Sequence, residues 1–103
     1  MTVRAYVAVL RIELHFPESA SLKARRRELA PVKAHLQTRL RATVAEVGHL
    51  DVWQRATLVA ALAGGSTRHL DGLVDGLEAW LDARFPAGAV VERRVVSWAD
   101  LDA

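Results

Sequence analysis

Residues 6–30, YVAVLRIELHFPESASLKARRRELA, predict a strand, a turn and the beginning of a helix in direct succession. Apolar residues stand at every second position of the first part, namely Tyr6, Ala8, Leu10, Ile12 and Leu14. Such alternation is typical of a strand with one face against a core, and we place this strand within residues 3–16. Pro17 ends it, and Ser21 is a good N-cap for a helix that begins at Leu22.

The predicted first helix has one apolar side, formed by Leu22, Leu29, Val32, Leu36 and Leu40. Residues at these spacings gather on one face of a helix, so this side should cover the core. Pro31 lies inside the helix and has no backbone N–H. We therefore expect a kink, or a restart of the helix, near residues 27–30.

The rest of the chain predicts a hairpin, a second helix and a last strand. Residues 42–50 and 52–63 are rich in Val, Ala and Thr and are separated by a polar turn, as in two paired strands. Residues 64–67 then supply a turn and an N-cap. The second helix is indicated by apolar residues at i, i+3 and i+4 spacing: Leu70, Leu73, Val74, Leu77, Trp80 and Leu81. Residues 85–88 end this helix, and residues 89–98 predict the final strand.

The order strand, helix, strand, strand, helix, strand predicts a single ferredoxin-like α+β domain over residues 1–103. In this fold a four-stranded antiparallel sheet carries both helices on one face and leaves the other face open. By strand parity, the open face should display Val7, Val9, Arg11, Glu13, Trp53, Arg55, Thr57 and Val59. This mixture is too apolar for a purely solvated face and too charged for an ordinary core.

Basic residues are concentrated in the predicted first helix. Residues 22–41 contain seven basic side chains and one acidic side chain, Glu28, although the whole chain has a net charge of only +2. The cluster at the helix start suits phosphate groups, because free backbone N–H groups there also attract anions; it consists of Lys23, Arg25, Arg26 and Arg27. The alternative is a solvated or salt-bridged face.

The predicted second helix carries an acidic flank of Asp71, Asp75, Glu78 and Asp82. If the two helices are antiparallel, the basic and acidic flanks either face each other or both face outward. Facing each other, they would neutralise much of the basic cluster. Facing outward, they would give the protein one basic edge and one acidic edge.

The composition and the spacing of potential catalytic or metal-binding residues argue against several classes of protein. The chain has no cysteine, which excludes disulfides, thiolate catalysis and cysteine metal sites and favours the cytoplasm. The apolar run at residues 5–14 is too short to cross a membrane and lacks the features of a signal peptide. Potential metal ligands lack the i, i+4 helical pairing of a zinc site: Glu13, His15, His49 and Asp51. We expect no enzymatic activity, no cofactor, no metal and no membrane partner.

Several segments resemble the YlxP-like family, a bacterial family of unknown function. They are residues 10–15, LRIELH; residues 21–23, SLK, followed by Arg26 and Arg27; residues 44–47, VAEV; residues 49–51; and residues 53–58, WQRATL. The resemblance covers nearly the whole chain and implies a ferredoxin-like fold. Genes of this family commonly neighbour those for transcription-termination, translation-initiation and ribosome-maturation factors, which implies an RNA or ribosome context. Ala24 and Pro31 depart from the family's pattern.

These observations predict a non-enzymatic accessory protein that binds RNA or a ribosomal subunit. Lys23, Arg25, Arg26 and Arg27 would contact phosphates, and the open sheet face would add Arg11, Trp53 and Arg55. The indole of Trp53 either stacks on a base or packs in a protein contact. The competing hypothesis is a homo-oligomeric interaction module, such as a homodimer, that buries the open face.

Overall fold

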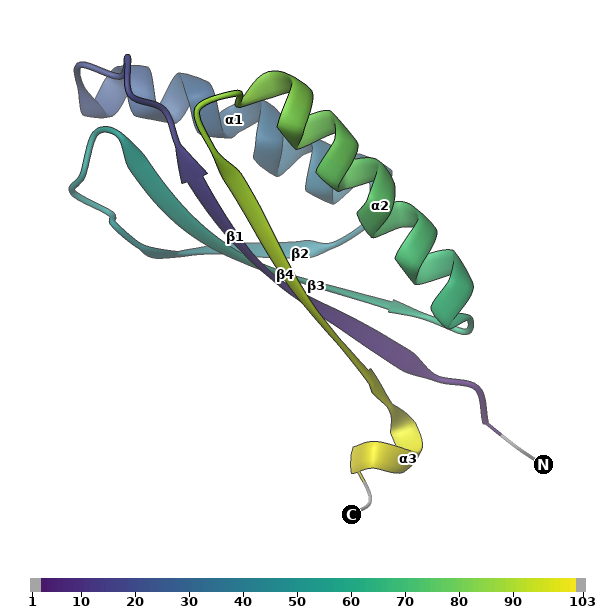
Figure 1. The fold of residues 1–103 in the computed structure, drawn as a ribbon. Helices are drawn as coiled ribbons and strands as arrows, with labels where there is room; N and C mark the ends of the chain where they lie inside the picture. Colours follow the sequence, from purple (N-terminus) through teal and green to yellow (C-terminus); the bar gives the residue numbers. More distant parts are fainter. Residues whose placement is uncertain (1–2, 102–103) are drawn as a thin grey trace.

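The computed structural model describes residues 3–101 and has the predicted ferredoxin-like architecture. Its elements are β1 (Tyr6–His15), α1 (Leu22–Arg39), β2 (Thr43–Gly48), β3 (Arg55–Gly64), α2 (Thr67–Arg84), β4 (Ala89–Ser97) and α3 (Trp98–Leu101). The strands form one antiparallel sheet in the order β2-β3-β1-β4. Helices α1 and α2 run antiparallel to each other and cover the same face of this sheet (Figure 1).

The core lies between the sheet and these two helices. Alternation in β1 turns its even-numbered residues inward, so that Leu10 and Ile12 are fully buried. Leu10 pairs with Ala60 and Ile12 with Leu58, which places the inward faces of β1 and β3 side by side. Buried residues of the helices complete the core: Leu29, Val32 and Leu36 from α1, and Leu70, Val74, Leu77 and Leu81 from α2.

Helix α1 runs as one helix from Leu22 to Arg39 with Pro31 inside it, so the expected restart near residues 27–30 is wrong. Its start is fixed as predicted, because the Ser21 hydroxyl accepts a hydrogen bond from the Ala24 N–H at 3.0 Å. Buried apolar residues on both sides of Pro31 hold the helix against the sheet, and this burial outweighs the missing backbone hydrogen bond. Leu22, predicted on the apolar side, is 36% exposed.

The β2–β3 connection is longer than the sequence predicts. Strand β2 ends at Gly48 after an irregularity between Glu46 and Gly48, and β3 begins only at Arg55. His49 has a left-handed backbone with φ of 57°, which turns the chain out of the ladder. Strand parity predicted that Trp53 would lie on the open face of the sheet. This prediction is wrong, because Trp53 lies in the loop before β3.

A short helix that the sequence analysis missed follows β4. Strand β4 stops at Ser97, and α3 begins at Trp98. The Ser97 N–H donates to Oδ2 of Asp100 at 2.9 Å, and the Asp100 N–H donates to Oγ of Ser97 at 3.1 Å. This reciprocal pair is an aspartate version of the capping box.

The molecule is elongated, with extents of 54 × 25 × 19 Å. One end holds the start of α1 and the β2–β3 loop, whereas the start of β1, the start of α2 and α3 lie toward the other end (Figure 1). Within residues 3–101, the structure contains no helix with both the length and the apolar character needed to cross a membrane.

Candidate nucleic-acid interface

Arg25, predicted to contact phosphates, is instead an internal side chain with an exposed fraction of 4%. Its guanidinium forms an ion pair with the Glu46 carboxylate of β2. It also donates hydrogen bonds to the backbone carbonyls of His49, at 3.0 Å, and Arg55, at 3.2 Å. A buried cation needs such partners, and here they are all internal, so Arg25 is removed from the phosphate-binding set.

Glu46 links α1 to β2 through two cations. Besides Arg25, its carboxylate binds the Lys33 ammonium at 3.3 Å. Burial by itself would raise the pKa of Glu46, but hydrogen bonds and charge attraction from Arg25 and Lys33 outweigh burial and hold this pKa below its ordinary value. Glu46 is therefore ionised at neutral pH and neutralises part of the basic charge of α1.

Three basic residues at the start of α1 remain exposed: Lys23, Arg26 and Arg27. Among residues 3–101, none of the three makes an ion pair within 4.0 Å. Arg26 lies nearly two turns before Lys33 and shares its flank, which faces β2. Lys23 and Arg27 are four residues apart and share the face that points away from the sheet. We call these three residues the basic start of α1.

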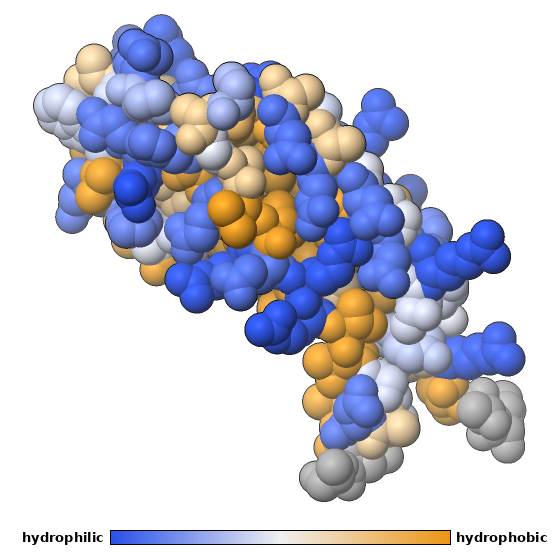
Figure 2. All heavy atoms as spheres, in the orientation of Figure 1, coloured by the Kyte–Doolittle hydropathy of each residue, from blue (hydrophilic) through white to orange (hydrophobic). Residues whose placement is uncertain are grey.

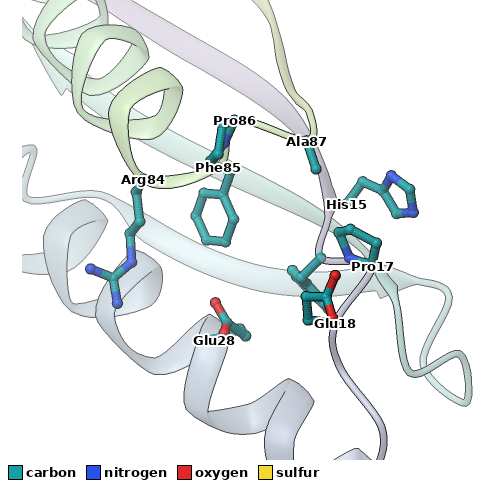
Figure 3. Close-up of a pocket in the computed structure, with 9 residues that line it drawn as sticks. His15, Pro17, Glu18, Glu28, Arg84, Phe85, Pro86 and Ala87 are labelled. Atoms are coloured by element: carbon teal, nitrogen blue, oxygen red, sulfur yellow. The ribbon is translucent and has the colours of Figure 1, made fainter.

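The opposite flank of this helix start has charged groups of both signs around a cavity. A cavity of about 300 Å³ lies where the end of β1, the start of α1 and the end of α2 meet. Figure 3 shows the Glu28 and Glu18 carboxylates and the Arg84 guanidinium around the Phe85 ring in this cavity. Because the Arg84 guanidinium of α2 shares the cavity with the two carboxylates, the charges on this side of the helix start are mixed.

Trp53 is 47% exposed and belongs to the β2–β3 loop, which lies at the same end of the molecule as the start of α1 (Figure 1). The two carbonyls bound by Arg25 belong to residues on either side of Trp53, so the loop is tied directly to the first turn of α1. The neighbouring Gln54 side chain donates to the Ser19 carbonyl at 2.9 Å, and its own carbonyl accepts from the Phe16 N–H at 2.9 Å. These bonds fix the loop at both ends.

Arg11 and Arg55 lie on the open face of the sheet, as predicted, but they are separated from the basic start of α1 by the sheet itself. Arg11 pairs with Glu13 at 3.1 Å, and the Thr57 hydroxyl donates to the same carboxylate at 2.7 Å. The predicted contact residues therefore fall into three sets. The exposed helix residues are Lys23, Arg26 and Arg27, the loop residue is Trp53, and the open-face residues are Arg11 and Arg55. The helix residues and the loop of Trp53 lie at the same end of the molecule, whereas the Arg11 side chain lies on the open face of the sheet.

The basic and acidic flanks of the helices both face outward. On α2, the acidic flank binds Arg93 of the edge strand β4; the ion pairs run from this guanidinium to Asp71, Asp75 and Glu78 at 3.2, 2.8 and 3.1 Å. Between the helices, His35 of α1 stacks on Trp80 of α2 with ring centroids 4.3 Å apart. Arg93 thus has a structural role that the sequence analysis did not assign.

Solved structures with a similar fold include one designed protein and parts of two flavoenzymes. The de novo designed protein Foldit4 has a TM-score of 0.60 at 12% identity, with 89% of this chain and 96% of that chain covered. The VAO-type flavoprotein MtVAO615 from Myceliophthora thermophila C1 has a TM-score of 0.59 at 18% identity, covering 92% and 17% of the two chains. CrmK, a flavoenzyme of caerulomycin biosynthesis, gives 0.58 at 16% identity, covering 95% and 21%. Identities this low show a common fold and nothing about activity.

Comparison of the sequence with curated proteins gave no match. A family model does match: it is described as "Protein of unknown function (DUF503)" and covers residues 7–94. The matched range runs from β1 into β4 and includes Arg25, Glu46 and the β2–β3 loop. The chain therefore belongs to the DUF503 family.

Proposed function

We propose that the protein is a non-enzymatic, cytoplasmic accessory protein that binds RNA or a ribosomal subunit through the basic start of α1. The observation that carries this proposal is a difference in exposure among the four basic residues at the start of α1. Arg25 is buried and neutralised, whereas Lys23, Arg26 and Arg27 are exposed and carry no ion pair within residues 3–101. The resemblance to the YlxP-like family, with its RNA-related gene neighbours, supports the same context.

The physical basis of the proposal is the attraction of a polyanion to clustered cations. Each phosphate that a lysine or arginine neutralises releases condensed counterions, which favours binding at low salt. Three such side chains within little more than one helical turn can contact neighbouring phosphates of one strand.

Replacing Lys23, Arg26 and Arg27 together with alanine should weaken co-sedimentation with ribosomal subunits. Because three phosphate contacts are lost, the slope of log affinity against log salt should become less negative by about 2–3. The measurement is the bound fraction across a series of salt concentrations, with purified subunits and with ribosomal RNA alone.

A matched control removes the same charge elsewhere. Arg4, Arg68 and Arg94 are exposed and lie outside the α1 end of the molecule. Their joint replacement by alanine should change binding and its salt dependence far less. Equal losses in the two triple variants would show that net charge alone is responsible, and an unchanged slope in the α1 variant would refute the proposal.

A second candidate function is homodimer formation through the apolar part of the open face, favoured by exposed hydrophobic residues there. Val7 and Val9 are exposed, and an adjoining cavity of about 400 Å³ is lined partly by Trp98 and Leu101 of α3. Figure 2 shows hydrophobic residues gathered on the strands beside α3. Light scattering should then give a dimer mass that Val9→Asp reduces and Leu50→Asp does not. A monomeric wild-type protein would remove this candidate.

A further inference from the structure

We infer that the RNA recognised at this surface is single-stranded, with one unpaired base stacked on Trp53 while adjacent phosphates contact Arg26 and its neighbours at the basic start of α1. This inference rests on the proposed function and specifies the class of RNA. It follows from three features of the loop, which are the exposure of its indole, its attachment to α1 and its apolar surroundings.

The exposed indole of Trp53 can stack on a base only where that base is unpaired. In an A-form duplex, the faces of the bases are covered by their neighbours, and proteins contact mainly phosphates and 2′-hydroxyls. In a single strand, a loop or a bulge, a base can turn out and stack on an aromatic side chain. Duplex RNA would use the basic start of α1 and leave the indole without a partner.

The loop that carries Trp53 is held in place before RNA arrives. Arg25 binds the carbonyls of His49 and Arg55, which flank the loop, and Glu46 fixes the guanidinium from the other side. Binding therefore does not require the loop to be ordered, which removes one cost of association. Arg25 thus acts as a positioning residue, because it ties both ends of the loop that carries Trp53 to the first turn of α1 without itself touching RNA.

The residues around Trp53 provide the apolar side of such a site. Leu50 and Val52, in the same loop, are both exposed, and they lie at the end of the molecule where α1 begins. A nucleotide presents a flat apolar base and a charged phosphate within one unit. The apolar side chains of this loop, which also carries the exposed Asp51, can meet the base while the cationic helix start meets the phosphate, whereas a purely acidic peptide would leave these apolar side chains without a partner.

The test uses a protein in which Trp53 is the sole tryptophan, made by Trp80→Phe and Trp98→Phe, with circular dichroism to confirm the fold. Single-stranded RNA of about 12 nucleotides should quench its fluorescence to saturation, and a duplex of the same sequence should quench it little. In the wild-type background, Trp53→Ala should lower single-strand affinity by about 5- to 150-fold without changing the salt slope. Trp53→Phe should retain most of the affinity, and duplex binding should be indifferent to both substitutions.

The outcomes separate this inference from the proposed function. If the triple α1 variant loses RNA while Trp53→Ala binds single strands and duplexes as the wild type does, the proposed function stands and the stacking inference is overturned. If the wild-type protein binds neither form of RNA at low salt, the proposed function and the inference both fail. Saturable quenching by the single strand, together with little quenching by the duplex and a loss of single-strand affinity in Trp53→Ala, supports the inference.

Discussion

Replacing Arg25 with alanine is expected to lower the free energy of unfolding by about 3–5 kcal/mol. The substitution leaves the Glu46 carboxylate half-covered with only Lys33 as a partner, and it leaves the carbonyls of His49 and Arg55 without their donor. Breaking a buried ion pair from one side costs more than the pair contributes, because a desolvated charge remains. Urea denaturation near neutral pH measures this difference.

Arg27 is the matched control for this prediction, because it is exposed and two residues away on the same helix. Arg27→Ala should change the free energy of unfolding by no more than about 0.5 kcal/mol. The pair Arg25→Met and Glu46→Leu, made together, should recover much of the loss, since the only charge left without its partner is then that of the more exposed Lys33. If Arg25→Ala costs no more than Arg27→Ala, the link between α1 and the loop is not what stabilises this end.

Replacing Pro31 with alanine is expected to raise the free energy of unfolding by about 1–3 kcal/mol. Helix α1 continues through Pro31, so the chain already has the backbone geometry that alanine prefers. Alanine restores an N–H that can donate to the Arg27 carbonyl, and it removes the contact between the proline ring and that carbonyl. Thermal unfolding should show a midpoint about 4–8 °C higher for each kcal/mol gained.

Gln37→Ala is the control for Pro31→Ala, because Gln37 is exposed in the same helix and already has its backbone N–H. Its effect should stay within about 0.5 kcal/mol. Destabilisation by Pro31→Ala would contradict the account. It would mean that packing of the half-buried ring contributes more than the hydrogen bond that it removes.

The fold was predictable because its pattern is local. Alternation in β1 and the helical spacing from Leu70 to Leu81 each identify one element and its inward face, and the order of elements then admits few topologies. Ser21 and Ser66 were recognisable as N-caps for the same reason, and both cap their helices. The three-residue spacing of Ser97 and Asp100 is likewise typical of a capping box and could have predicted the start of α3.

The burial of Arg25 could have been predicted from its position in the helix, although the count of basic residues favoured an exposed site. Arg25 stands four residues before Leu29 and seven before Val32, so it lies in line with the apolar side of α1. Its partner Glu46 occupies an inward position of β2, two residues after Val44. A basic residue in register with a core stripe, and an acidic residue in register with a core strand, together predict an internal pair.

The position of Trp53 could not be obtained from parity. Parity holds only inside a continuous strand, and β3 begins only at Arg55, two residues after Trp53. The left-handed backbone of His49 then turns the chain away from the sheet. No residue type in this segment demands either feature, so the loop position of the indole depends on tertiary contacts with α1.

The most direct test of the central claim is to map RNA contacts on the protein by following backbone amide chemical shifts during titration with single-stranded RNA. The account predicts that the largest shifts fall within residues 21–27 and 49–55, with small changes in α2 and α3. In the protein with Lys23, Arg26 and Arg27 replaced by alanine, the same titration should leave these amides unmoved. Largest shifts in the open-face valines or in α2, with residues 21–27 unchanged, would contradict phosphate binding at the start of α1.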